Sequence, residues 1–218
     1  MYRSASGYEL LMLVLYGRHY RARMAAVGAQ VPAGASVLEL CCGPGTLYER
    51  YLRERAGEYV GVDVNERFIA RLMRRGVDAR RIDLAHGGGS LPAVDVVIMQ
   101  ASLYHFLPYP EAVVARMLAA ARDRVVIAEP VRNLATSDVA VVRWLGRRAA
   151  DPGVGTHEER FTEATLDRLM DRYRERVLAA FLVPGGREKV YVLAAADARE
   201  APARVGGPGR AGVNGRVG

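Results

Sequence analysis

The sequence predicts a single α/β domain in which seven strands form a mostly parallel sheet, with helices on both faces and an antiparallel hairpin at the carboxyl-terminal end. Short apolar runs of strand length alternate with segments of helical periodicity, which favours right-handed crossovers between parallel strands. The last two strand-like segments are joined by Pro184-Gly185-Gly186 and therefore form a hairpin. The chain has 218 residues, half of them apolar, which is enough for one domain with a substantial core.

Each element follows from a local pattern. Residues 94–99 are almost uninterruptedly apolar, as expected for a central strand covered on both faces. The last helix begins at Thr162 with a capping pattern. The expected strands span residues 37–40, 58–63, 77–84, 94–99, 124–128, 176–183 and 188–194, and the expected helices span 6–30 with a break at Gly17, 47–55, 65–75, 111–122, 134–150 and a stretch from 162 onward.

These elements give three regions. Residues 1–34 are expected to form a helical cap whose apolar face packs on the sheet, and residues 35–197 form the main domain. Residues 198–218 contain six glycines and two prolines with almost no apolar side chain to bury, so we expect this tail to be disordered.

The main domain is organised around residues 37–46, which read VLELCCGPGT. A short buried strand leads into a tight turn, and a helix follows. Gly43 and Gly45 let the backbone approach a ligand closely, while the start of the helix offers unpaired N–H groups to an anion. This pattern indicates a cofactor-binding turn.

A carboxylate follows at the right distance from this turn. Asp63 ends the second strand about twenty residues later, where an acidic side chain can accept hydrogen bonds from two ribose hydroxyls. A helix-capping role for Asp63 is the alternative, although Asn65 is better placed for it. A dinucleotide fingerprint fits less well, because a G-x-G-x-x-G reading from Gly43 requires a small residue at Tyr48.

Composition narrows the function classes. The net charge is +7, but the four arginines and one glutamate of residues 198–218 contribute about +3 of it, so the folded part is only mildly basic and charge carries little weight as a sign of nucleic-acid binding. The two cysteines are adjacent and provide neither a disulfide framework nor a zinc site, which favours a reducing cytoplasm. No apolar run approaches the length of a membrane span, and we expect no metal site and no membrane partner.

The segment VLELCCGPGT resembles motif I of the class I S-adenosylmethionine (SAM) dependent methyltransferases, usually close to VLDLGCGPG. Cys41 stands where that family usually has its first glycine. The resemblance implies a Rossmann-like fold and SAM as cofactor. It also implies that Asp83, after the third strand, contacts the adenine amino group. The cofactor-binding residues expected on this basis are Glu39, Cys41, Cys42, Gly43, Gly45, Asp63, Val64, Ile82, Asp83 and Gln100.

The reaction centre is expected after the fourth strand, in the segment QASLYHFLP. His105 is the leading candidate for a general base because imidazole titrates near neutral pH. It could instead tie the loop to the backbone or contact the cofactor. Tyr104 lies beside it, and His157 belongs to an H-x-x-R-F turn that resembles one in the family. By the same resemblance, the pocket residues expected from the leading helices are Tyr8, Tyr16, His19 and Tyr20. Glu129, Arg132 and Asn133 follow the fifth expected strand and are candidates for the substrate side of the site, with a plain surface loop as the alternative.

The absence of certain motifs restricts the chemical class of the methyl acceptor. No [DN]-P-P-[YF] sequence follows the fourth strand, and neither cysteine lies outside motif I, so exocyclic amines of DNA bases and thiolate-activated pyrimidines are disfavoured. The sequence therefore predicts methyl transfer to oxygen or nitrogen of a small molecule. An RNA or protein methyltransferase, and a SAM-binding protein without transfer activity, are the alternatives.

Overall fold

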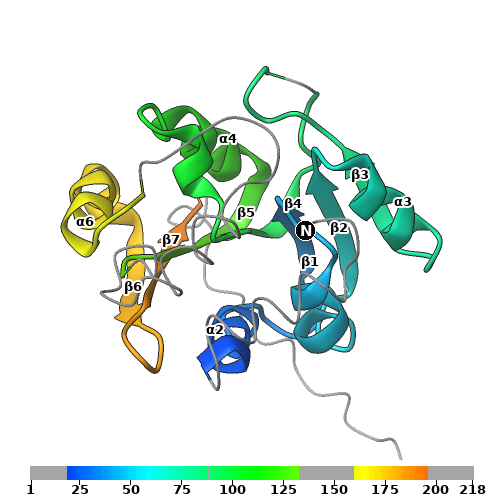
Figure 1. Ribbon diagram of the computed structural model, residues 1–218, viewed down its shortest axis with the longest axis horizontal. Helices are drawn as coiled ribbons and strands as arrows, with labels where there is room; N and C mark the ends of the chain where they lie inside the picture. The colour runs from blue at the N-terminus through cyan, green and yellow to red at the C-terminus, as the bar shows by residue number, and fades with distance from the viewer. Residues whose placement is uncertain (1–18, 88, 133–159, 196–218) are drawn as a thin grey trace, which may run out of the picture.

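A seven-stranded sheet with the strand order β3-β2-β1-β4-β5-β7-β6 forms the centre of the molecule (Figure 1). The computed structural model describes residues 19–87, 89–132 and 160–195. The first five strands pair in parallel, and β7 pairs antiparallel with both β5 and β6. The strands are β1 (Ser36–Leu40), β2 (Glu58–Asp63), β3 (Asp78–Arg81), β4 (Val94–Gln100), β5 (Ala121–Pro130), β6 (Val177–Leu182) and β7 (Glu188–Ala194). The predicted mostly parallel sheet with a final antiparallel hairpin is thus confirmed.

Helical segments cover both faces of this sheet, as the sequence predicted (Figure 1). They are α2 (His19–Gly28), η1 (Tyr48–Leu52), α3 (Glu66–Met73), η2 (Leu103–Phe106), α4 (Glu111–Ala120), α6 (Glu163–Met170) and η4 (Asp171–Arg176). Successive strand residues point to opposite faces. Val97 therefore packs with the α4 and α6 side chains, whereas Val96 and Ile98 pack with α2 and η1.

Several elements differ from the sequence prediction in their bounds or in their helix type. The helix expected over 111–122 ends at Ala120, because Ala121 already pairs with Val94 as the first residue of β5. Strand β3 covers only 78–81 of the expected 77–84. The helix after the glycine turn contains a π-helical segment, in which the Arg53 N–H donates to the Tyr48 carbonyl at 2.9 Å.

The amino-terminal prediction is tested only over α2. Tyr20, Arg23 and Val27 are buried at helical spacing, and Val27 packs into the core on one face of the sheet. The remainder of the predicted 6–30 helix, the 134–150 helix and the tail lie outside the described residues.

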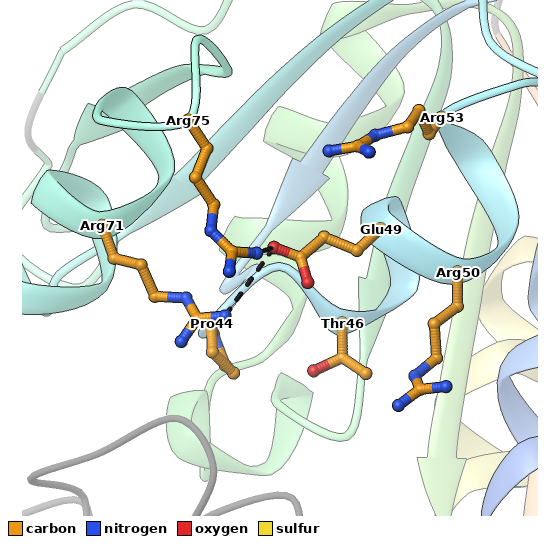
Figure 2. A pocket seen from close by; sticks show the side chains of 7 residues that line it. All are labelled: Pro44, Thr46, Glu49, Arg50, Arg53, Arg71 and Arg75. Carbon is orange, nitrogen blue, oxygen red and sulfur yellow. Dashed lines mark hydrogen bonds and ion pairs between the residues drawn. The ribbon is translucent and has the colours of Figure 1, made fainter.

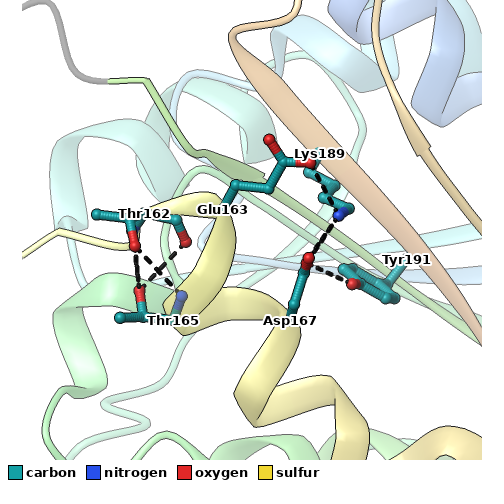
Figure 3. Close-up of polar contacts among 6 residues, drawn as sticks. All are labelled: Thr162, Glu163, Thr165, Asp167, Lys189 and Tyr191. Atoms are coloured by element: carbon teal, nitrogen blue, oxygen red, sulfur yellow. Dashed lines mark hydrogen bonds and ion pairs between the residues drawn. The ribbon is translucent and has the colours of Figure 1, made fainter.

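Helix α6 is capped and anchored as shown in Figure 3. The Thr162 hydroxyl accepts from the Thr165 N–H, and the Thr165 hydroxyl accepts from the Thr162 N–H, which completes a capping box. Lys189 of β7 donates to Asp167 at 2.8 Å and to Glu163 at 3.0 Å. These contacts hold α6 against the antiparallel end of the sheet, away from the glycine turn.

Candidate functional site

The glycine turn lies at the point where the strand order reverses. Strand β1 has β2 on one side and β4 on the other, so the crossovers leave this position in opposite directions. In open parallel sheets the crevice beyond the carboxyl ends of such strands is where ligands bind. The segments that leave β1 and β4 there are the turn from Cys41 to Gly45 and the loop that starts at Gln100.

The turn uses three left-handed backbone conformations. Cys41, Gly43 and Gly45 have φ values of 55°, 56° and 81°. At Gly45 the close packing also excludes a side chain, because an added Cβ would lie 2.4 Å from Cδ2 of Leu72 in α3. Cys41 is the exception to the pattern, since an L-residue in this region is strained and glycine is not.

Asp63 connects the turn to the end of β2. One carboxylate oxygen accepts from the Gly43 N–H and the other from the Asn65 N–H, each at 2.8 Å. Burial raises the pKa of Asp63, while these backbone donors oppose the shift. The structure thus brings the predicted ribose-binding acid into direct contact with the glycine turn.

Glu39 lies beneath the turn. It is 5% exposed and accepts a hydrogen bond from the Tyr59 hydroxyl at 2.7 Å. Burial raises the pKa of Glu39 to about 8, although the Tyr59 hydrogen bond works against this. Burial likewise raises the pKa of the Cys41 and Cys42 thiols, so neither cysteine has the thiolate character of a nucleophile.

A small pocket joins these residues to the loop after β4. Its volume is about 80 Å³, which is less than the several hundred cubic ångströms of a typical complete ligand site. Three segments line the pocket: β1 with the glycine turn, the end of β4 with its following loop, and α2. The lining residues are Glu39, Cys41, Cys42, Gly43, Pro44, Thr46 and Leu47 from the first segment, Gln100, Ala101 and Ser102 from the second, and Tyr20, Arg23 and Met24 from the third.

A buried polar network closes the α2 side of this pocket. Arg23 and Glu188 are 3% and 1% exposed, and the Arg23 Nε lies 2.5 Å from Glu188 Oε2. The Gln100 amide donates to Glu188 Oε1 at 2.7 Å. Sequence reasoning missed Arg23 and Met24 as pocket-lining residues, and Glu188 as the buried partner of Arg23 and Gln100. The available signal was the spacing of Arg23 from Tyr20 on one helical face, together with a carboxylate at the start of an apolar strand.

Glu129 holds the loop that carries the predicted catalytic residues. This fully buried carboxylate accepts from the backbone N–H groups of Ser102 and Leu103 at 2.7 and 2.6 Å. Burial raises the pKa of Glu129 to about 8, opposed by those two donors and assisted by the charge of Glu188. A buried acid from β5 therefore positions the start of η2.

The predicted catalytic residues Tyr104 and His105 follow on η2. Their rings lie 4.0 Å apart between centroids, and the Arg160 guanidinium lies 3.6 Å from the centre of the Tyr104 ring. Neither side chain is among those lining the 80 Å³ pocket. His157 lies outside the described residues.

The other predicted cofactor residues lie beyond this pocket. Val64 is 44% exposed after β2, and the Ile82 N–H donates to the Asp63 carbonyl at 3.2 Å. Asp83 is exposed, accepts from the Ala85 and His86 N–H groups and lies 2.9 Å from His86 Nδ1. The pKa of Asp83 is lowered, mainly by His86. Adenine contacts by Ile82 and Asp83 stay a prediction.

The described residues show neither a cluster of metal ligands nor a membrane-spanning helix. No three His, Cys, Asp or Glu side chains there gather as metal ligands would. No helix in the same part of the chain has the length and apolar character needed to cross a membrane.

Comparison with known proteins gives a family and a fold. The model of a methyltransferase domain matches residues 16–174. No curated protein matches the sequence.

Solved structures with the same fold include three methyltransferases. Magnesium protoporphyrin IX methyltransferase from Synechocystis, solved with S-adenosylhomocysteine (SAH) bound, is 16% identical; the alignment covers 88% of this chain and 96% of that one, with a TM-score of 0.57. The N-methyltransferase NodS from Bradyrhizobium japonicum is 14% identical over 83% and 96%, with a TM-score of 0.55. A Haloferax volcanii methyltransferase in complex with the activator Trm112 is 13% identical over 86% and 97%, with a TM-score of 0.60.

Proposed function

The chain belongs to the family of proteins with a methyltransferase domain, and on this premise we propose that it transfers a methyl group from SAM to an oxygen or nitrogen atom of a small molecule. Family membership and the shared fold make it a SAM-dependent methyltransferase. The acceptor class and the role of each residue are the proposed part.

One observation carries the assignment of the cofactor site. The glycine turn, the Asp63 carboxylate bonded to Gly43 and the loop from Gln100 converge at the point where the strand order reverses. This arrangement fits a nucleoside with a charged amino-acid end, because it combines close backbone approach with carboxylates for hydroxyl and ammonium donors. When bound, SAM supplies an electrophilic methyl group.

We assign the roles as follows. Asp63 binds the ribose hydroxyls, and Cys41, Cys42, Gly43, Gly45 and Glu39 form the floor under the amino-acid end. Gln100 lies at the boundary between cofactor and acceptor, while Val64, Ile82 and Asp83 form the adenine side. The segment η2 follows the pocket-lining Ser102 directly, and we assign its side chains to the acceptor side of the site.

His105 accepts the proton released by an O–H or N–H acceptor as its lone pair bonds to the methyl carbon. Tyr104 and His157 orient the acceptor. The protein otherwise contributes alignment and exclusion of water. The small-molecule class is supported by the absence from the sequence of the motifs that DNA-base methyltransferases carry.

Calorimetry with SAH tests the cofactor site. Asp63→Ala should weaken SAH binding by about tenfold or more, since it removes a charged hydrogen-bond partner worth roughly 1.5–3 kcal/mol. Asp78→Ala is the matched control, because Asp78 is an exposed acid on neighbouring β3 whose carboxylate accepts hydrogen bonds from Arg80. Equal SAH affinity in wild type and Asp63→Ala would contradict the assignment.

Methyl transfer from labelled SAM to a panel of phenols, carboxylic acids and amines tests the acceptor class. His105→Ala should lower turnover by about 10²-fold with unchanged SAH affinity, and the acidic limb of the pH–rate profile should disappear. Tyr109→Ala, in the exposed residue after the same loop, serves as the control. Transfer to RNA or protein with none to the panel would contradict the small-molecule proposal.

A further inference from the structure

A second pocket, lined mainly by arginines, lies on the outer side of the glycine turn (Figure 2). It encloses about 230 Å³, several times the ~30 Å³ of one water molecule. Arg50 and Arg53 line it from the helix after the turn, and Arg71 and Arg75 line it from α3 and its carboxyl-terminal end. Two successive helical segments therefore place four guanidinium groups around one hollow.

The lining carries an excess of positive charge. Glu49 is its one carboxylate; it is paired with Arg75, and its Oε1 lies 3.8 Å from Arg71 Nη2. Among the lining residues, four guanidinium groups face a single carboxylate. Partly exposed ion pairs of this kind contribute about 0–1 kcal/mol each, so the pairs with Glu49 do not by themselves account for gathering four like charges.

We propose that this pocket binds a doubly or more highly charged phosphate group, such as the pyrophosphate end of a small molecule. Guanidinium groups match phosphate oxygens in two-pronged hydrogen bonds, and several of them together balance a multiple negative charge. The hollow has room for more than one phosphate. The assignment goes beyond methyl transfer, and it does not depend on any residue assigned to the SAM site.

The position of the pocket connects it to the cofactor site. Pro44 and Thr46 line both pockets, the arginine pocket from one side of the turn and the 80 Å³ pocket from the other. A phosphate held by the arginines would therefore contact the same turn that we assign to SAM. Phosphate binding and SAM binding are thus expected to influence each other.

The local charge pattern favours a small ligand over a polynucleotide. A polynucleotide backbone requires a continuous basic track. Here the basic residues surround a hollow, and the exposed acids Glu54 and Glu66 interrupt the surface of the same two helical regions. The ligand chemistry is therefore a compact phosphate cluster.

Titration calorimetry of the full chain with pyrophosphate, at low ionic strength and without SAM, tests the proposal. We expect one site per chain. Arg53→Gln should weaken binding about tenfold, because it removes a unit charge a few ångströms from a divalent anion. Glu49→Gln should tighten binding severalfold, since it releases Arg71 and Arg75 from their competing carboxylate.

Arg74→Gln is the matched control. Arg74 is an exposed arginine at the same end of α3 and does not line the pocket, so its loss should change affinity less than about twofold. Thermal unfolding of each variant shows whether it is folded.

Absence of pyrophosphate binding, or equal losses of affinity in Arg53→Gln and Arg74→Gln, would overturn the proposal. Tighter binding of an oligoribonucleotide than of pyrophosphate, abolished by the same substitutions, would also overturn it in favour of a nucleic-acid surface. Because SAH binding is measured separately, failure here leaves the methyltransferase assignment intact.

Discussion

Replacement of Glu129 by glutamine should remove a substantial part of the pH dependence of folding. Burial raises the pKa of Glu129 to about 8 in the folded protein, from 4.5. The folded state therefore binds more protons than the unfolded state between these two pH values. The stabilising contribution is fully present below pH 4.5 and is lost as the pH rises through about 8.

The size of the effect follows from the shift. Each pKa unit corresponds to ~1.36 kcal/mol, so the shift from 4.5 to about 8 represents about 5 kcal/mol over the whole range. Between pH 6 and pH 9 the free energy of unfolding should fall by roughly 3 kcal/mol on account of Glu129 alone. Glutamine is neutral throughout, and its Oε1 can still accept from Ser102 and Leu103.

Urea unfolding at several pH values between 6 and 9 provides the measurement. Glu129→Gln should show a decrease smaller than that of the wild type by about 3 kcal/mol. Glu39, whose pKa is also raised to about 8, should account for part of the dependence that remains. Glu175→Gln, at an exposed position on η4, is the control and should keep the wild-type dependence. The same decrease in Glu129→Gln as in the wild type would show that Glu129 is ionised in the fold at neutral pH and would refute the reasoning.

Five further substitutions probe the turn and the contacts of α6. Gly45→Ala should destabilise the fold by roughly 2–4 kcal/mol and Gly43→Ala by about 1–2 kcal/mol in thermal unfolding. Both glycines have positive φ, but only at Gly45 would an added Cβ lie 2.4 Å from Leu72 Cδ2. Equal losses of stability in the two variants would show that contact with Leu72 makes no difference. Cys41→Gly should bind SAH at least as tightly as the wild type in calorimetry, since glycine adopts the φ of 55° without strain; weaker binding would instead assign the thiol a contact. Asp167→Asn should reduce the free energy of unfolding by about 0.5–1 kcal/mol at pH 7, because it weakens the contact with Lys189. A double-mutant cycle with Lys189→Met should give a coupling energy of the same size. Additive losses in the double variant would show that the two side chains do not stabilise each other.

The fold was largely predictable because its signals are local. The apolar runs that became β2 and β7 were predicted with the boundaries that the structure has, and the turn at Pro184 gave the hairpin. The misplaced end of α4 illustrates the limit. Ala120, Ala121 and Arg122 suit a helix equally well, and pairing of Ala121 with β4 decides where the strand begins.

The candidate site was predictable where one segment supplies it. The glycine turn and Asp63 could be found because a sharp turn requires glycine and because the second strand places an acid beside it. Glu129 was named as a candidate for the site because it follows the strand expected at residues 124–128, but its role as the support of residues 102 and 103 required the paired strands. For Asp83 the sequence was less informative. The contact of its carboxylate with His86, three residues further along the same turn, was not predicted.

The sequence by itself determined the order of strands and helices, the glycine turn at the switch point and the family to which the chain belongs, because each of these depends on residues close together along the chain. Only the tertiary structure decided that Arg23 of α2 meets Glu188 of β7, and that the arginines of two successive helices surround one pocket beside the turn. These groupings join residues tens to well over a hundred positions apart. Their contacts depend on which face of the sheet each helix covers and in which register, and those are properties of packing that no local periodicity encodes.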